Sequence, residues 1–507
     1  MRFRMFWWFV IAGSLTFAPL AHAATIRVEG GRVEGTVKDG MRIWLGIPYA
    51  APPVGDLRWR APQSVVPWLG VRSTTAFSPA CRQTATWITL PESEDCLYLN
   101  IWAPQEGKRE KLPVMVWIHG GGYYGGTAAQ PLFDGAHIAR HGVIVVTLNY
   151  RLGVFGFFSH PDLAVEGKVD GNQGLLDQVA ALRWVKSNIA AFGGDPGRVT
   201  IFGESAGSES VAILTTSPLA RGLFQRAIGE SGNMAMPIDD YEDANFDKVA
   251  AEANGVALGK TLNAPHLADL RKVDTETLIR QPWSPGAVVD NYLVPTDMAA
   301  AYRKSQPSRV PLLVGWNADE GKDLAPEIIG TSDFNAERYP AQVAQLLGHV
   351  PSRAVLDAYP VKSDADAKPA LFKLTTDVWG WRMWKWAKLH VTSKSGASYV
   401  YEFVHIPAEP ATPCGYGCGA GHGAEIPYVF DQLGQDRRAW SADDHLLAER
   451  MVTYWTNFAK TGDPNGEALP TWKHFDGSDA SVVRLGGDHE VEAAQPLPDF
   501  KLIEDRP

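Results

Sequence analysis

Ser205 stands between two glycines in the sequence VTIFGESAG, residues 199–207. An apolar run typical of a buried strand precedes it, and a helix-like run follows it. A serine on such a sharp strand-to-helix turn exposes its hydroxyl, and the small residues Gly203 and Gly207 let neighbouring backbone approach closely. The context predicts that Ser205 is a nucleophile. The spacing alone also arises by chance in a chain with 49 glycines, so the prediction depends on finding a base, an acid and an oxyanion site.

The sequence WIHGGGYYGG, residues 117–126, offers an oxyanion site. Gly120, Gly121 and Gly122 follow an apolar run, and such a loop can aim backbone N–H groups at one point. Together with the amide of Ala206 these groups would stabilise a tetrahedral intermediate, and one donor of this kind contributes about 3 to 4 kcal/mol to transition-state stabilisation. The alternative is a flexible turn, but the position upstream of Ser205 favours the oxyanion site.

The base and the acid must follow Ser205, because triads on α/β sheets run in the chain order serine, acid, histidine. His422 is the candidate base, since it lies in the glycine-rich sequence GCGAGHGAE directly before the apolar IPYVF. The sequence VPLLVGWNADEG supplies Asp319 and Glu320 immediately after an apolar run. Chemistry alone leaves the choice between these two carboxylates open. The other histidines after Ser205 are His266, His349, His390, His405, His445, His474 and His489.

Apolar runs predict the elements that position these residues. Residues 112–118, 142–150, 199–202 and 310–316 are continuously apolar, which is typical of strands buried on both faces of a mostly parallel sheet. Between the second and third runs, apolar residues recur at helical spacing over 172–192, so the order is strand, helix, strand. Residues 235–305 and 335–395 are helix-leaning and are expected as insertions over the strand ends. No linker or repeat interrupts the chain, which predicts a single domain over residues 24–507.

The first 23 residues have the pattern of a signal peptide. Arg2 and Arg4 precede an apolar run, and the segment closes on Ala21-His22-Ala23. We expect cleavage after Ala23 and a secreted or periplasmic location. The alternative is an uncleaved anchor, but Phe6 to Leu20 is shorter than the roughly 20 residues that span a bilayer. No later segment is apolar enough to span, so we expect no stable membrane span after cleavage.

Composition narrows the class of protein. The net charge of −10 and the pI near 5.7 argue against nucleic acid as a partner, because phosphates attract a basic face. Export permits disulfides, and four cysteines allow three pairings. Closure of short loops favours Cys81 with Cys96 and Cys414 with Cys418. No feature of the sequence predicts an oligomeric state.

With these motifs in hand, the chain resembles the type-B carboxylesterases, the family that includes the cholinesterases and bacterial p-nitrobenzyl esterases. FGGDPGRVTIFGESAG, residues 192–207, resembles the nucleophile signature, and EDCLYLNIWAP, residues 94–104, resembles the second signature. The similarity runs from GIPYAAPPVGDLRW near residue 46 to YWTNFAKTGDPN near residue 465. It implies an α/β-hydrolase fold, in which helices flank a large, mostly parallel central sheet and insertions cover the active site.

The resemblance also implies residue roles. It makes Glu320 the acid that assists Ser205 and His422, and it matches the oxyanion-hole positions to Gly121, Gly122 and Ala206. It implies that Cys96 closes a loop with Cys81, and that Arg151 and Asp177 form a structural ion pair.

The chain also departs from the family pattern. The cholinesterases carry aromatic residues just after the acid, where this chain has Lys322, Asp323 and Leu324, and this disfavours a choline-binding gorge. Trp87 loosely resembles their cation-binding tryptophan. Cys414 and Cys418 have no counterpart in the pattern.

Several residues admit two interpretations. Glu204, beside the nucleophile, either tunes the histidine electrostatically, which we favour, or fills the turn. Trp379, Trp381, Trp384 and Trp386 are spaced for a helix and would line either the core or the cleft. Cys414, Cys418, His422 and His405 have the ligand types of a zinc site, but zinc would take up the only histidine in register with the family, and export favours a disulfide.

The sequence therefore predicts an exported serine carboxylic-ester hydrolase with a Ser-Glu-His triad, acting on a small-molecule ester without cofactor or metal. Two alternatives stay open at this point. The first is a non-catalytic cholinesterase-like binding protein, although such proteins usually lack the serine that this chain retains. The second is an acyltransferase on the same scaffold, in which an alcohol replaces water as the acceptor.

Overall fold

The apolar runs form a central sheet with two buried faces. The computed structural model describes residues 24–105, 111–167, 170–232, 247–304, 307–408, 410, 419–435, 438–478, 481–486, 492–493 and 497–504. Within these residues the predicted strands are present as β9 (Leu112–Ile118), β10 (Ile144–Leu148), β11 (Gly194–Glu204) and β13 (Leu312–Asn317).

The described residues form an 11-stranded sheet. Its strands lie in the order β16 (Glu492–Ala493), β15 (Val482–Leu485), β14 (Ser398–Phe403), β13, β12 (Arg226–Glu230), β11, β9, β10, β8 (Tyr98–Pro104), β4 (Met41–Pro48) and β3 (Thr36–Lys38). Two small sheets lie outside it: β1 (Ile26–Val28) with β2 (Gly31–Glu34) and β5 (Val71–Ser73), and β6 (Ala80–Cys81) with β7 (Glu92–Ser93).

The centre of the large sheet is parallel and its edges are antiparallel. Neighbours from β15 to β10 pair in parallel, as predicted. The pairs β10/β8, β8/β4, β4/β3 and β15/β16 are antiparallel. Parallel neighbours need a crossover connection, whereas β3 and β4 are joined directly through Asp39 and Gly40, both with positive φ. An Asp-Gly pair of this kind is typical of a tight hairpin.

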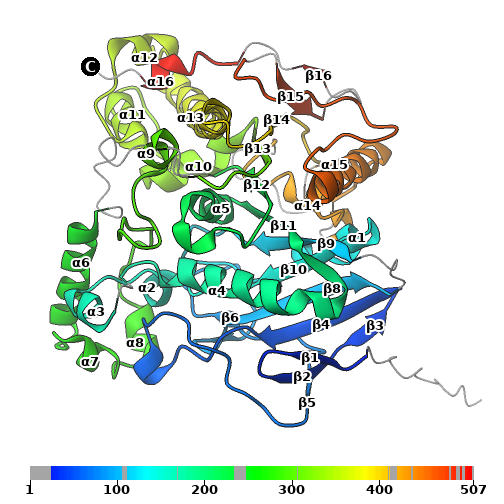
Figure 1. Ribbon diagram of the computed structural model, residues 1–507. Helices are drawn as coiled ribbons and strands as arrows, with labels where there is room; N and C mark the ends of the chain where they lie inside the picture. The colour runs from blue at the N-terminus through cyan, green and yellow to red at the C-terminus, as the bar shows by residue number, and fades with distance from the viewer. Residues whose placement is uncertain are drawn as a thin grey trace, which may run out of the picture.

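Helices cover both faces of the sheet (Figure 1). Alternate residues of β9 point to opposite faces: Val114 and Val116 pack with one cluster, and Met115 and Trp117 with another. The first cluster includes α4 (Gln173–Asn188), α5 (Ala206–Thr216) and α13 (Asp364–Thr392). The second includes α1 (Ala136–Arg140), α14 (Ile426–Val429) and α15 (Ala442–Thr461). The segment 335–395 therefore packs on the first face of the sheet through α13.

Of the remaining helices, α9 (Met298–Arg303), α10 (Glu320–Ile329), α11 (Tyr339–Leu347), α12 (Arg353–Ala358) and α16 (Lys501–Glu504) add to the first cluster. The helices α2 (Gly153–Gly156), α3 (Pro161–Glu166), α6 (Lys248–Thr261), α7 (Leu267–Leu270) and α8 (Thr275–Ile279) contribute to a third, smaller cluster.

Both implied scaffold contacts are present. Arg151 Nε and Nη2 each lie 2.7 Å from a carboxylate oxygen of Asp177, and both side chains are buried. A bidentate pair of this kind adds geometric specificity, and it ties the loop after β10 to α4. Cys81 and Cys96 form a disulfide.

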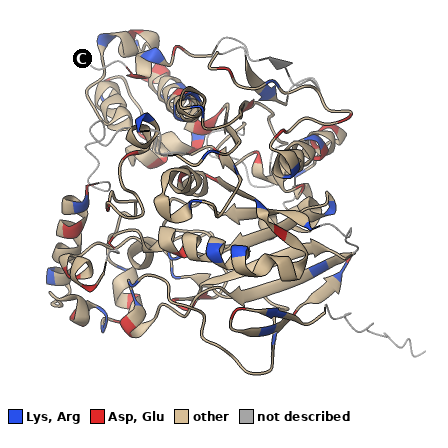
Figure 2. Cartoon of the chain, viewed as in Figure 1, with Lys and Arg blue, Asp and Glu red and all other residues tan. Residues whose placement is uncertain are grey.

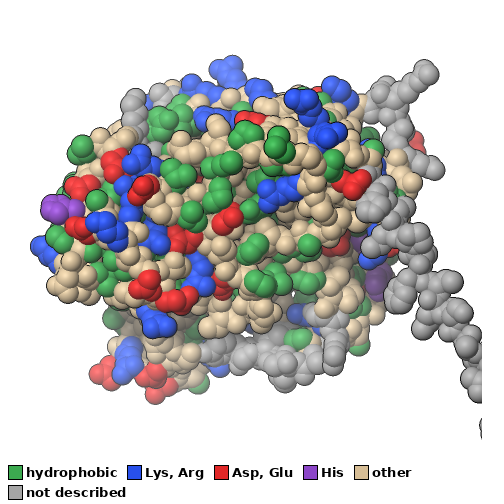
Figure 3. All heavy atoms as spheres, turned by 90° about the horizontal axis from the view of Figure 1, so that it is seen from below, with side chains coloured by type: hydrophobic (Ala, Val, Ile, Leu, Met, Phe, Trp, Pro, Cys, Tyr) green, Lys and Arg blue, Asp and Glu red, His purple; other side chains and the backbone are tan. Residues whose placement is uncertain are grey.

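The surface carries both signs of charge. Figure 2 shows Lys and Arg interspersed with Asp and Glu along the outer elements. Figure 3 shows hydrophobic side chains scattered among polar ones on the face seen from below, which is usual for a protein surface. Among the helices of the described residues, none has the length and apolar character needed to cross a membrane.

Candidate active site

Ser205 occupies the predicted turn between β11 and α5. Its φ of +55° and ψ of −126° lie in a sparsely populated region for a residue with a side chain, and such a conformation costs about 1 to 3 kcal/mol. The turn is held by Ser205 N, which donates to Glu230 O at 2.9 Å. A Cβ at Gly207 would lie 2.0 Å from Ile118 O, so only glycine lets α5 start this close to β9. The strand predicted before Ser205 and the helix predicted after it are confirmed as β11 and α5.

The glycine-rich loop lies directly against the serine. A Cβ at Gly120 would be 3.0 Å from Ser205 Cβ. Gly121 has a φ of +100°, and its carbonyl accepts from the amides of Tyr124 and Gly125 at 3.0 and 2.9 Å, which makes the loop a tight turn. A pinned turn of this kind can keep amides in a fixed direction, which oxyanion stabilisation requires.

His119, at the start of this loop, is a buried support. Its carbonyl accepts from the hydroxyl of Tyr150 at 2.8 Å, and its ring stacks on the ring of Tyr150 with centroids 4.4 Å apart. Burial lowers the pKa of His119 to about 4, against which its contact with Gly120 O acts only weakly. His119 is therefore neutral at physiological pH and stiffens the loop.

Of the two carboxylates left open by the sequence, Glu320 is the one that contacts His422. Glu320 Oε2 lies 2.6 Å from His422 Nδ1, and the Glu320 side chain is fully buried. Its second oxygen accepts from the amide of Asn317 at 3.0 Å. The carboxylate is thus held from both sides, at the point where β13 ends and α10 begins.

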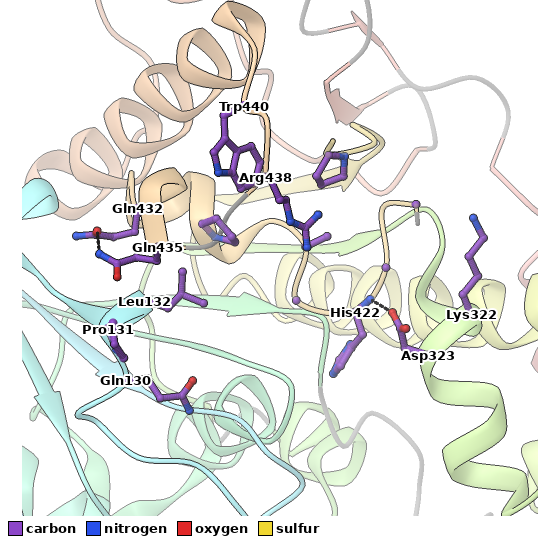
Figure 4. Close-up of a pocket in the computed structure, with 16 residues that line it drawn as sticks. Gln130, Pro131, Leu132, Lys322, Asp323, His422, Gln432, Gln435, Arg438 and Trp440 are labelled. Atoms are coloured by element: carbon purple, nitrogen blue, oxygen red, sulfur yellow. Dashed lines mark hydrogen bonds between the residues drawn. The ribbon is translucent and has the colours of Figure 1, made fainter. Parts of the chain in front are cut away.

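Two aspartates hold the histidine loop in place. Asp319 Oδ2 accepts from Ala420 N at 3.0 Å. Asp323 Oδ2 accepts from His422 N at 2.9 Å, a contact drawn in Figure 4. Asp323, noted as a departure from the cholinesterase pattern, therefore supports the backbone of His422 from α10.

The other ring nitrogen of His422 faces Glu204. Nε2 lies 3.2 Å from Glu204 Oε1, and the exposed fractions of the two side chains are 17% and 8%. Among the hydrogen bonds of the described residues, none joins Ser205 Oγ to the ring. Glu204 therefore contacts the histidine itself, in line with the electrostatic role that we favoured.

The carboxylates dominate the electrostatics of the site. Burial by itself lowers the pKa of His422, but the carboxylates of Glu204 and Glu320 more than reverse this and raise it to about 10. Burial raises the pKa of Glu204 to about 7, opposed by the charge of His422. Glu204 therefore favours the protonated form of the ring, and His422 can act as a base only when Nε2 is deprotonated.

A cavity of about 550 Å³ opens beside the histidine loop (Figure 4). His422 and Asp323 line it on one side, and Arg438 and Trp440 line it on another. The guanidinium of Arg438 lies 5.5 Å from the centroid of the Trp440 ring. The cavity wall combines charged and amide side chains with apolar ones such as Leu132 and Pro427. Such a wall suits a ligand that carries both polar and apolar groups.

Sequence reasoning missed three buried residues behind the triad candidates. They are Glu230 at the end of β12, Asn317 at the end of β13, and Glu425 just before α14. Only Glu425 had a signal, because it stands three positions after His422. Glu230 and Asn317 end apolar strands, and nothing local distinguishes them from residues exposed at a strand end.

The residues with two interpretations divide between core and surface. Trp381, Trp384 and Trp386 are at most 8% exposed and belong to the first core cluster. Trp379 is partly buried, and its Nε1 donates to Ser231 O at 3.2 Å. Trp87 is 53% exposed and packs edge-on against Tyr124 of the glycine-rich loop.

The cysteine pair before the histidine lies outside the described residues. This applies to Cys414 and Cys418, to their predicted bridge and to the alternative zinc site. His405, the further ligand of that alternative, is engaged elsewhere, since its Nε2 lies 2.7 Å from Asp444 Oδ1. Within the described residues, no cluster of His, Cys, Asp and Glu has the arrangement of a metal site.

Comparison with known proteins places the chain in a family. The model of the carboxylesterase family matches residues 22–498. The chain is 37% identical to the fumonisin B1 esterase of Sphingopyxis macrogoltabida, over 88% of this chain and 84% of that protein. It is 36% identical to the para-nitrobenzyl esterase of Bacillus subtilis strain 168, over 92% of this chain and 96% of that protein.

Solved structures agree with this assignment. A para-nitrobenzyl esterase superposes with a TM-score of 0.77 at 34% identity, covering 91% of this chain and 95% of that one. A thermophilic para-nitrobenzyl esterase superposes with a TM-score of 0.78, also at 34% identity and with the same coverage. The chain therefore belongs to the carboxylesterase family, has the α/β-hydrolase fold and is a carboxylic ester hydrolase.

Proposed function

We propose that the enzyme hydrolyses small-molecule esters through an acyl-enzyme formed on Ser205. His422 takes the proton of the serine hydroxyl as the oxygen attacks the ester carbonyl, and it then delivers that proton to the leaving alcohol. Glu320 holds the ring in the tautomer that leaves Nε2 free to accept. Water, activated by the same histidine, releases the acid.

The observation that carries the proposal is the contact between Glu320 and His422. A fully buried carboxylate 2.6 Å from Nδ1 directs the opposite nitrogen, Nε2, toward the β11–α5 turn, where Glu204 and Ser205 lie. Catalytic hydrogen bonds are often long before substrate binds, so the 3.2 Å contact of Nε2 with Glu204 is compatible with a later contact to Ser205 Oγ.

The oxyanion of the tetrahedral intermediate is assigned to the amides of Gly121, Gly122 and Ala206. Ala206 is the first residue of α5, so its amide is not used inside the helix and its direction is set by the helix axis. Gly121 and Gly122 both have positive φ, and the loop that they form lies against Ser205 at Gly120.

The class of substrate is proposed from the relatives and the site together. The names of two relatives specify a fumonisin B1 ester and para-nitrobenzyl esters as substrates of those proteins. Both are small-molecule esters, and we extend this class to the present enzyme. A choline ester is disfavoured, because Lys322, Asp323 and Leu324 follow the acid where the cholinesterases carry aromatic residues, and Asp323 holds the histidine loop.

Burst kinetics with a p-nitrophenyl ester test the mechanism. Ser205→Ala and His422→Ala are each expected to abolish acyl-enzyme formation while the fold stays intact, as checked by circular dichroism. Matched controls are Ser64→Ala and His266→Ala, since both residues are exposed. A burst retained in Ser205→Ala would falsify the assignment of the nucleophile. Release of free acid, rather than an acylated alcohol, identifies water as the acceptor.

We further propose that the enzyme is exported, with cleavage after Ala23. Support comes from the basic residues, apolar run and small-x-small ending of residues 1–23, together with the Cys81–Cys96 disulfide, which persists in oxidising compartments. Fractionation of producing cells, followed by mass spectrometry of the N-terminus, is expected to find a chain that begins at Ala24 outside the cytoplasm. A chain that keeps residues 1–23 in the cytoplasm contradicts export.

A further inference from the structure

Two glutamates and a tyrosine lie in one row that crosses four strands directly behind the proposed triad. Glu204 on β11 pairs with Glu230 on β12, Glu230 pairs with Gly315 on β13, and Gly315 pairs with Tyr401 on β14. Partners in register on parallel strands point to the same face of the sheet. A Cβ at Gly315 would be only 2.2 Å from the Tyr401 ring, so the tyrosine fills the space above the glycine and closes the row beside Glu230.

The row is sealed from solvent by α15. Glu230 is fully buried, and Trp455 on α15 donates from Nε1 to Glu230 Oε1 at 2.8 Å. The second oxygen, Glu230 Oε2, makes no hydrogen bond to any group in the described part of the chain. The same holds there for Glu425 Oε1 and for the hydroxyl of Tyr401. A buried polar atom without a partner is costly, and an ionised carboxylate can only accept. A proton on Glu230 Oε2 would remove a buried charge from this group and turn an unpaired acceptor into a donor.

Charge leads to the same conclusion as geometry. Three buried carboxyl groups, those of Glu204, Glu320 and Glu425, act on the single imidazole of His422. The fourth, that of Glu230, is within reach of the charges of Glu425 and Glu204, and all four act on Tyr401 of β14. Four buried carboxylates beside one cation cannot all be ionised at acceptable cost. Burial, together with the charges of Glu425 and Glu204, raises the pKa of Glu230 well above its ordinary value.

We propose that Glu230 is a positioning residue of the active site: it is held as the neutral acid with its proton on Oε2, so that negative charge stays at Glu204 and Glu320 on the two nitrogens of His422. This inference rests on the proposed function, because it acts through the base of that mechanism. Glu230 itself contacts no reacting atom.

Two substitutions separate this role from simple packing. Glu230→Gln keeps the shape, the neutral charge, the acceptor for Trp455 and a donor at the second position. It is expected to leave kcat and the acid limb of the kcat/KM profile close to those of the wild type. Glu230→Met keeps the volume but removes the donor, and kcat is expected to fall about tenfold with a displaced acid limb. Glu402→Gln is the matched control, because Glu402 is the next residue after Tyr401 on β14, points to the opposite face and pairs with Arg484.

The results that overturn the proposal are definite. If Glu230→Gln moves the midpoint of the acid limb to lower pH by about one unit, Glu230 is ionised in the working enzyme. If folded Glu230→Met keeps the wild-type midpoint, Glu230 has a packing role alone.

A spectroscopic measurement decides the question independently of catalysis. The infrared difference spectrum of wild type minus Glu230→Gln at neutral pH is expected to show the carbonyl band of a protonated carboxylic acid, whereas the Glu402→Gln difference is not. Absence of the Glu230 band overturns the proposal. The Ser205→Ala kinetics test the proposed function separately, so failure of the mechanism and failure of this inference are distinguishable.

Discussion

Replacing Glu204 with glutamine tests the electrostatics of the site most directly. Glu204 Oε1 lies 3.2 Å from Nε2, the nitrogen that must be free to take the proton of Ser205. At that distance a full charge pair in a medium of effective dielectric constant near 20 is worth about 5 kcal/mol. Glu204 is itself protonated below its raised pKa of about 7, and the ring is 17% exposed, so the measurable effect is smaller. We expect Glu204→Gln to lower the pKa of His422 by about one to three units.

The assay is the pH profile of kcat/KM with a p-nitrophenyl ester, because kcat/KM reports the ionisation of the free enzyme. The wild-type acid limb is expected to extend into alkaline pH, since the pKa of His422 is raised to about 10. In Glu204→Gln the midpoint of that limb moves to lower pH, whatever happens to the plateau. The midpoint is the readout because the plateau also responds to altered packing. Glu467→Gln, a change at an exposed loop position, serves as the control.

The reasoning is refuted if the midpoint stays where it is or moves to higher pH in Glu204→Gln while the fold is intact. An unmoved midpoint would mean that Glu204 carries no charge in the free enzyme. The histidine would then owe its raised pKa to Glu320 and Glu425.

Three further predictions concern the acid, the disulfide and the pH dependence of stability. Glu320→Gln leaves the contact with His422 possible but favours the wrong tautomer, and we expect kcat to fall by about 10⁴ in steady-state assays, as for the equivalent change in a serine protease triad; a loss below tenfold would exclude Glu320 as the acid. The double change Cys81→Ser with Cys96→Ser opens a loop of 15 residues, and urea unfolding is expected to show that the free energy of unfolding falls by about 3 kcal/mol. An unchanged midpoint would mean that opening the loop gives the unfolded chain no additional conformational freedom. The pKa values of Glu204 and Glu425 rise from 4.5 to about 7 and 8, so the folded chain keeps protons that the unfolded chain releases, and the free energy of unfolding falls as the pH rises through this window. Urea titrations at several pH values measure how steeply the free energy of unfolding falls with pH, and we expect a shallower fall in Glu425→Gln. An equal dependence on pH in the variant and the wild type counts against the burial of these charges.

The local sequence was a sufficient guide wherever chain neighbours set the structure. Four apolar runs marked β9, β10, β11 and β13, because strands buried on both faces need continuous apolar residues. The strained turn at Ser205 was predictable because glycine spacing and a strand-to-helix transition are local features. Even the disulfide of Cys81 and Cys96 follows from short loop closure.

Contacts between distant segments needed the tertiary structure. The choice of Glu320 over Asp319 depends on which carboxylate meets the His422 ring: Glu320 contacts Nδ1, whereas Asp319 accepts from the backbone of Ala420. Chemistry read from the residues left that choice open, and only the family resemblance pointed to Glu320.

What the sequence by itself determined is the set of reactive groups and the elements that carry them. What only the tertiary structure decided is the electrostatic setting of those groups. Glu204 and Glu230 are 26 residues apart in the chain and become neighbours through the parallel register of β11 and β12. Burial and proximity of carboxyl groups set how protons are distributed around His422, and both are properties of packing, which no local pattern encodes.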